Sequence, residues 1–102
     1  MADAPGTPLM RAALVGIDFG TGDFNASLEE LSLLAKSAGA EPITTITAKR
    51  SSPDPALFIG SGKADEIALD AKALGVDIVI FNHALSPAQQ RNLERRLELR
   101  VV

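Results

Sequence analysis

The chain has 102 residues, a formal net charge of −3 at pH 7 and no cysteine. This length allows one hydrophobic core, so we expect a single folded domain. The absence of cysteine excludes thiol chemistry and cysteine-ligated metal, and the net negative charge excludes a basic surface over the whole domain, so any contact with RNA must be local.

The first ten residues, 1–10, predict a flexible tail, because proline, glycine and alanine make up much of this stretch. The tail contains no apolar run of secretory length, and no later run approaches the roughly 18 apolar residues of a membrane-spanning helix. We therefore expect a cytoplasmic protein without a membrane partner, folded over residues 11–102.

The first half of this domain predicts a strand, a helix and a strand. Residues 12–18 are apolar and lead into a glycine-rich turn, as expected of a buried strand. Apolar side chains then recur every three or four residues over 24–38, which is typical of an amphipathic helix, with Gly39 as its C-terminal cap. A second strand is predicted over 42–48, which is rich in β-branched residues and places Pro42 at the strand's beginning.

The second half begins with a polar loop over residues 49–55. Residues 58–59, Phe and Ile, predict a very short strand that returns antiparallel to the second one. A helix is predicted over 62–74, because apolar side chains repeat at helical spacing until Gly75 ends them. Residues 78–81 form an uninterrupted apolar run, which favours an interior strand of a parallel sheet.

The last helix has the clearest start signal in the chain. Ser86 can cap the helix, Pro87 suits its first position, and Gln89 can complete a capping box. Residues 97–102 then lead into one more strand, inside which the sequence stops; we expect a protein cut from a longer one.

This order of elements predicts an α/β fold: a small, mainly parallel sheet of about four strands plus a short antiparallel strand, with three helices. We expect the strands that start near Ala12 and Val76 to lie side by side in the middle.

Three stretches carry a family resemblance. They are residues 23–31 (Asp-Phe-Asn-Ala-Ser-Leu-Glu-Glu-Leu), residues 50–55 (Arg-Ser-Ser-Pro-Asp-Pro) followed by 58–63 (Phe-Ile-Gly-Ser-Gly-Lys), and residues 85–94 (Leu-Ser-Pro-Ala-Gln-Gln-Arg-Asn-Leu-Glu). In this order they resemble the N-terminal domain of HflX-type GTPases of the Obg-HflX superfamily. The resemblance runs from about Arg11 to the last residue.

The resemblance implies a role within a larger protein. A helical segment and a GTPase domain would follow residue 102, and that domain would bind and hydrolyse GTP with Mg²⁺. The parent protein would associate with the large ribosomal subunit and its RNA in the cytoplasm, and would act on stalled or idle ribosomes. The chain itself would contact its own GTPase domain.

A glycine-rich turn invites a phosphate-loop interpretation, but its spacing is wrong for a Walker loop. Such a loop needs glycine where Leu57 stands and serine or threonine where Ala64 stands. A turn that requires glycine geometry is the simpler interpretation, and a weak anion site at a helix N-terminus is the alternative. The four turn residues are Gly60, Ser61, Gly62 and Lys63.

These four residues, together with residues 20–23, support a second hypothesis, a stand-alone sensor domain for phosphate or an adenine nucleotide. No catalytic residue is identified. Ser86 is explained as a helix cap rather than a nucleophile, and His83, the single histidine, has neither cysteine nor a second histidine with which to bind metal. The sequence therefore favours a non-catalytic domain without a metal site.

Local contact with RNA is the remaining possibility. Arg91 and Arg95 are the best candidates, because a spacing of four places both on one helical face. The alternative is that they form ion pairs with Glu94 and Glu98 on the same helix. The second-choice RNA candidates are Lys49, Arg50 and Lys63.

Overall fold

The computed structural model describes residues 10–102, so the predicted tail, apart from Met10, lies outside the described residues. Strands and helices alternate along this part of the chain. They are β1 (Met10–Asp18), α1 (Phe24–Ser37), β2 (Ala40–Lys49), α2 (Ser61–Leu74), β3 (Ile78–Phe81), α3 (Pro87–Leu97) and β4 (Arg100–Val101). No helix among residues 10–102 is long and apolar enough to cross a membrane.

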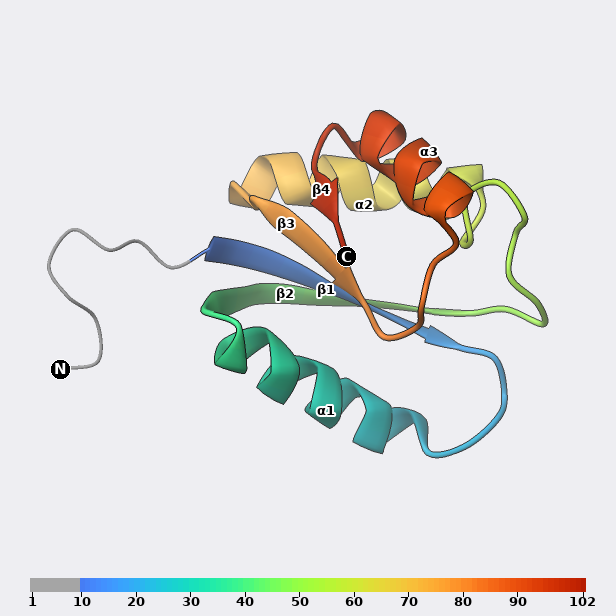
Figure 1. The fold of residues 1–102 in the computed structure, drawn as a ribbon, viewed down its shortest axis with the longest axis horizontal. Coiled ribbons are helices and arrows are strands. Elements are labelled where there is room, and N and C mark those ends of the chain that lie inside the picture. The colour runs from blue at the N-terminus through green and yellow to red at the C-terminus, as the bar shows by residue number, and fades with distance from the viewer. Residues whose placement is uncertain (1–9) are drawn as a thin grey trace, which may run out of the picture.

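The four strands form one sheet in the order β2-β1-β3-β4, and every neighbouring pair is parallel. The predicted α/β fold and the central position of β1 and β3 are confirmed. Helix α1 lies on one side of the sheet, whereas α2 and α3 lie on the other (Figure 1). Right-handed crossovers explain this division, because the connection through α1 crosses the sheet in the direction opposite to the two later connections.

The antiparallel strand predicted at residues 58–59 is wrong. Phe58 does not pair with β2 but forms an isolated bridge with Asp54 inside the same loop, with backbone N–H···O distances of 2.8 and 2.9 Å. Phe58 also has a φ of 68°, which turns the chain instead of extending it. The apolar character of Phe58 and Ile59 reflects a buried loop, since both residues are at most 4% exposed.

Pro42 does not begin its strand, because β2 starts two residues earlier at Ala40. The proline is tolerated for two other reasons. β2 is an edge strand, and the register between β1 and β2 shifts next to Pro42, where Ile43 is left without a partner. A residue without an N–H is acceptable at an edge or a bulge.

The core has two parts, one on each face of the sheet. The larger part packs β1 and β3 against α2 and α3 through Val15, Val79 and Leu93. The smaller part packs the opposite side of the same strands against α1 through Leu14 and Leu31. Alternate residues of β1 therefore serve opposite layers, as the apolar run without polar alternation predicted.

Candidate functional site

The carboxyl ends of β1 and β3 form the position where open parallel sheets of this kind commonly bind ligands, because the connections leave it toward opposite faces. Here Asn82, the residue after β3, occupies that position. Its Oδ1 accepts a hydrogen bond from the Ile17 backbone N at 2.9 Å, and its Nδ2 donates to Ser27 Oγ at 3.0 Å. One side chain thus joins β1, β3 and α1.

Aromatic rings close the same edge of the sheet. His83 Nε2 lies 2.9 Å from the Ile17 carbonyl oxygen, and its ring centroid is 4.8 Å from that of Phe19. Phe58 packs edge-on against both Phe19 and Phe81, at centroid distances of 5.7 and 6.0 Å. The strand ends therefore pack against side chains of the chain itself, and His83 takes part in that packing.

The glycine-rich stretch 60–63 spans the start of α2, and its two glycines have different roles. Gly60 is the N-cap, with φ 82° and ψ 162°, a conformation that only glycine adopts without strain. Gly62 is an ordinary residue of the first helical turn. Lys63 forms an ion pair with Glu66 along the helix, with an Nζ–Oε2 distance of 2.9 Å. The interpretation of a turn that needs glycine geometry thus applies to Gly60 alone.

The turn after β1 lies near this region, with Arg50 between the two. The Arg50 backbone N donates to the Asp18 carbonyl oxygen at 3.0 Å, while its Nη1 donates to the Ile59 carbonyl oxygen at 3.0 Å. Asp18 accepts from the Gly20 backbone N at 2.8 Å, and Asp23 caps α1 through the Ala26 backbone N. A shallow hollow of about 330 Å³ lies beside Arg50 and Lys49.

Both glycine turns of the sensor hypothesis therefore lie at one edge of the sheet. Two charged groups beside these turns, however, form hydrogen bonds within the protein. The Arg50 guanidinium donates to loop carbonyl oxygens, and the Asp18 carboxylate accepts from the Gly20 backbone N. No group of three His, Asp or Glu side chains that could hold a metal is found among residues 10–102.

Two sides of α3 hold neighbouring parts of the domain. Toward the loop before α2, Gln89 Nε2 donates to the Asp54 carbonyl oxygen at 2.9 Å. Toward α2 itself, Arg96 donates twice to the Asp65 carboxylate, at 2.8 and 3.1 Å. This pairing lowers the pKa of Asp65, mainly through the hydrogen bond from Arg96, and raises the pKa of Arg96.

The loop that α3 holds is itself closed by a carboxylate. Asp54 Oδ1 accepts hydrogen bonds from the backbone N of Leu57 at 2.7 Å and of Ala56 at 2.8 Å. These two donors, Leu57 first, lower the pKa of Asp54. The loop is therefore an ordered part of the fold rather than a free binding loop.

A third side of α3 closes the edge of the sheet. Gln90 Nε2 donates to the Val101 carbonyl oxygen at 2.7 Å, and Glu94 Oε2 accepts from the Val101 backbone N at 3.1 Å. Leu93 and Leu97 are buried in the core. Arg91 and Arg95 remain on the exposed side of the helix.

The ion pairs considered for Arg91 and Arg95 are not seen. Among residues 10–102 two ion pairs occur, Lys63–Glu66 and Arg96–Asp65, and neither involves these two arginines. Glu94 is instead bonded to β4. The structure therefore leaves both candidate RNA contacts accessible, whereas Arg50 and Lys63, two of the second choices, are engaged in contacts of their own.

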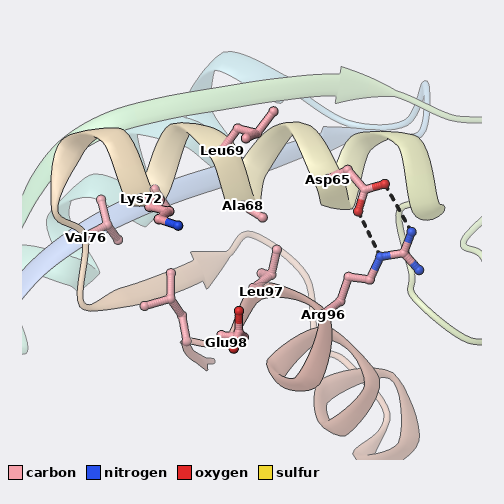
Figure 2. Close-up of a pocket in the computed structure, with 10 residues that line it drawn as sticks. Asp65, Ala68, Leu69, Lys72, Val76, Arg96, Leu97 and Glu98 are labelled. Atoms are coloured by element: carbon pink, nitrogen blue, oxygen red, sulfur yellow. Dashed lines mark hydrogen bonds and ion pairs between the residues drawn. The ribbon is translucent and has the colours of Figure 1, made fainter.

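A groove of about 590 Å³ was not predicted from the sequence. It lies between α2 and the corner that joins α3 to β4, with the Arg96–Asp65 pair at one end and Lys72 near the other (Figure 2). Its lining is partly apolar, with Ala68 from α2 and Leu97 from α3. The groove combines residues from α2 and α3 that are far apart in the sequence, so no local sequence pattern predicts it.

The fold defines a small α/β domain in which the polar side chains described above form hydrogen bonds with the domain's own loops and with the edge strand β4. A solved structure described as "crystal structure of SsGBP and GDP complex" shares this fold, with a TM-score of 0.67 and 20% identity over 91% of this chain and 25% of that one. The family model for GTP-binding GTPase N-terminal domains matches residues 25–102, and the chain belongs to this family, the N-terminal domain of HflX GTPases.

Relatives of known name agree with this assignment. The GTPase HflX of Escherichia coli strain K12 is 49% identical over 92 residues, which are 90% of this chain and 22% of that protein. The GTPase HflX of Alkalihalophilus pseudofirmus is 33% identical over 104 residues, covering 100% of this chain and 25% of that protein. The chain thus spans about a quarter or less of the length of these relatives.

Proposed function

We propose that this chain is the non-catalytic N-terminal module of a cytoplasmic GTP-binding protein that associates with the large ribosomal subunit and acts on stalled or idle ribosomes. In this proposal GTP and Mg²⁺ bind to a GTPase domain elsewhere in the longer protein, which this module contacts. The relatives named GTPase HflX support the activity of the parent protein. The main support for a non-catalytic module is Asn82, because its contacts with Ile17 and Ser27 occupy the position where such sheets bind ligands.

The exposed side of α3 is the best candidate for contact with ribosomal RNA. Arg91 and Arg95 lie one helical turn apart, and neither takes part in an ion pair within residues 10–102. Guanidinium groups bind phosphate oxygens through two donors at once, which suits the RNA backbone. Because the whole chain is acidic, such a contact depends on these local charges.

The test is ribosome association of the full-length protein across a salt series. The variant Arg91→Ala/Arg95→Ala should bind more weakly, and its dependence of log affinity on log salt should flatten by roughly one unit or somewhat less per lost phosphate contact. The control Lys36→Ala/Lys72→Ala removes the same charge from the ends of α1 and α2 and should leave the slope unchanged. An unchanged affinity and slope for the arginine variant, with the protein still folded, would exclude this helix as the RNA contact.

A further inference from the structure

One stripe of α2 lies along the mouth of the groove beside α3. The residues that α2 buries in the core are Ala64, Ile67 and Ala71. The stripe, which we call the α2 stripe, consists of four other residues that line the groove, namely Asp65, Ala68, Leu69 and Lys72 (Figure 2). Leu69 is 71% exposed, more than any other large apolar side chain among the described residues. A leucine this exposed beside a partly apolar groove forms a patch that a partner can bury.

The α2 stripe is complementary to its own reversed order. Along the helix it reads acidic, small, large and basic, with spacings of three, one and three residues. In an antiparallel pair of α2 helices centred between positions 68 and 69, Asp65 stands opposite the partner's Lys72. Leu69 stands opposite the partner's Ala68, so that a large side chain meets a small one. Each contact then occurs twice, as a two-fold axis requires.

The charges at the two ends of the stripe suit this pairing. Lys72 forms no ion pair with any residue in 10–102, so its ammonium group is available to a second copy. Asp65 accepts two hydrogen bonds from Arg96, at 2.8 and 3.1 Å. A carboxylate has about four acceptor positions, so Asp65 can bind a further cation while Arg96 holds it in place.

The groove leaves room for this approach. It separates α2 from the corner between α3 and β4, so a second helix can lie along its mouth without displacing either element (Figure 2). Leu97 and Leu99 supply apolar surface on the far wall, against which the partner's Leu69 adds buried area. A small molecule inside the groove would leave Leu69 on the rim exposed, whereas a second copy buries both the groove and the leucine.

We propose that two copies of this chain associate through the α2 stripe as an antiparallel two-fold pair. The contact is small, because one helical stripe falls well below the about 800 Å² per partner of a standard interface. The dimer is accordingly weak, with a Kd between about 10 µM and 1 mM. Such a dimer needs neither GTP nor ribosomes, so it stands or falls independently of the proposed function.

Sedimentation equilibrium of residues 1–102 measures the association. The chain has neither tryptophan nor tyrosine, so interference optics should be used in place of ultraviolet absorbance. The average mass should rise with concentration from that of one copy toward that of two. The mass of a single copy at all concentrations up to about 1 mM would overturn the proposal and would mean that another kind of partner uses the groove.

A charge in place of the exposed leucine tests the contact itself. Leu69→Asp should raise the Kd by at least about ten-fold, because it buries a carboxylate against the partner's Ala68. The matched control Leu33→Asp makes the same change on α1, at a position that is 65% exposed and on the other side of the sheet, and should leave the Kd unchanged (Figure 1). Equal effects of the two substitutions would exclude the α2 stripe as the contact.

Charge reversal tests the orientation of the pair. Asp65→Lys places like charges together at both ends and should raise the Kd by about ten-fold. Asp65→Lys/Lys72→Asp restores opposite charges and should bring the Kd back to within about three-fold of wild type. Both variants lose the Arg96–Asp65 pair, so that loss cannot explain a difference between them. A double variant that associates no better than the single one would refute the antiparallel arrangement.

A zero-length crosslink locates the contact without any substitution. A carbodiimide joins a lysine amine to a carboxylate only where the two groups touch. In a mixture of isotope-labelled and unlabelled protein, crosslinked peptides that carry one label each should join Asp65 to Lys72. Mixed-label crosslinks that involve only other carboxylates would place the contact elsewhere and refute the proposal. Circular dichroism of each variant shows that the exposed substitutions have not unfolded the domain.

Discussion

Replacing Asn82 by alanine should destabilise the domain far more than its half-exposed position suggests. The substitution removes the acceptor of the Ile17 backbone N–H, which is 2.9 Å away, and the donor to Ser27 Oγ. Ile17 is only 1% exposed, so water cannot readily replace that acceptor. A buried donor left without a partner costs about 1–3 kcal/mol.

We therefore expect the free energy of unfolding to fall by about 2 kcal/mol in Asn82→Ala. For a domain of this size that loss corresponds to a decrease of roughly 10 °C in Tm or about 1 M in the urea midpoint. Urea titration followed by circular dichroism measures it, with equal slopes for wild type and variant showing that the comparison is valid.

Two further variants separate the hydrogen bond from general effects. Ser27→Ala should cost less than Asn82→Ala, because the bond to Ile17 remains. Asn25→Ala replaces an exposed asparagine of α1 and should change the stability by no more than about 0.5 kcal/mol. If Asn82→Ala is as stable as Asn25→Ala, the account of Asn82 as the residue that joins β1, β3 and α1 is wrong.

Three other predictions concern the turns and their charges. Gly60→Ala should lower the free energy of unfolding by about 1–3 kcal/mol, because a φ of 82° strains any residue with a side chain and a Cβ would lie 3.0 Å from Arg50 Nη1. The control Gly62→Ala places its Cβ in open space, so it should be neutral or stabilising in the same urea titration. The folded-state pKa values of Asp54 and Asp65 lie below their ordinary value of 3.8, so their stabilisation is complete above that pH and is lost as the pH falls through the lower folded-state values. The free energy of unfolding should accordingly fall less between pH 5 and pH 2 in Asp54→Asn/Asp65→Asn than in wild type. Equal losses in the two proteins would show that these two carboxylates do not contribute to the pH dependence of stability. Isothermal titration of residues 1–102 with GTP and Mg²⁺ should show no specific binding, and micromolar affinity would refute the assignment of a non-catalytic module. An ATP titration should not distinguish wild type from Lys63→Ala, and ATP binding that depends on Lys63 would favour the sensor hypothesis.

Local patterns in the sequence were enough to predict the elements whose start or end depends on neighbouring residues. The capping box of α3 is present as predicted, with hydrogen bonds of 2.9 and 3.1 Å between Ser86 and Gln89. Gly75 ends α2 in the left-handed conformation. Such signals succeed because a cap bonds to residues only a few positions away, so the sequence contains both partners side by side. The family resemblance was equally readable, because its motifs are contiguous.

The bonding partner of each polar side chain, by contrast, depends on how distant parts of the chain pack together. Arg96 binds Asp65, 31 positions away, and Asn82 binds Ile17, 65 positions away. Helix spacing had instead grouped Arg91 and Arg95 with the nearby Glu94, which turns toward β4. Phe58 and Ile59 likewise look like a strand, because burial in a loop and burial in a sheet select the same apolar residues. Long-range packing, which determines the partner and the solvent exposure of each side chain, is absent from any local window of sequence.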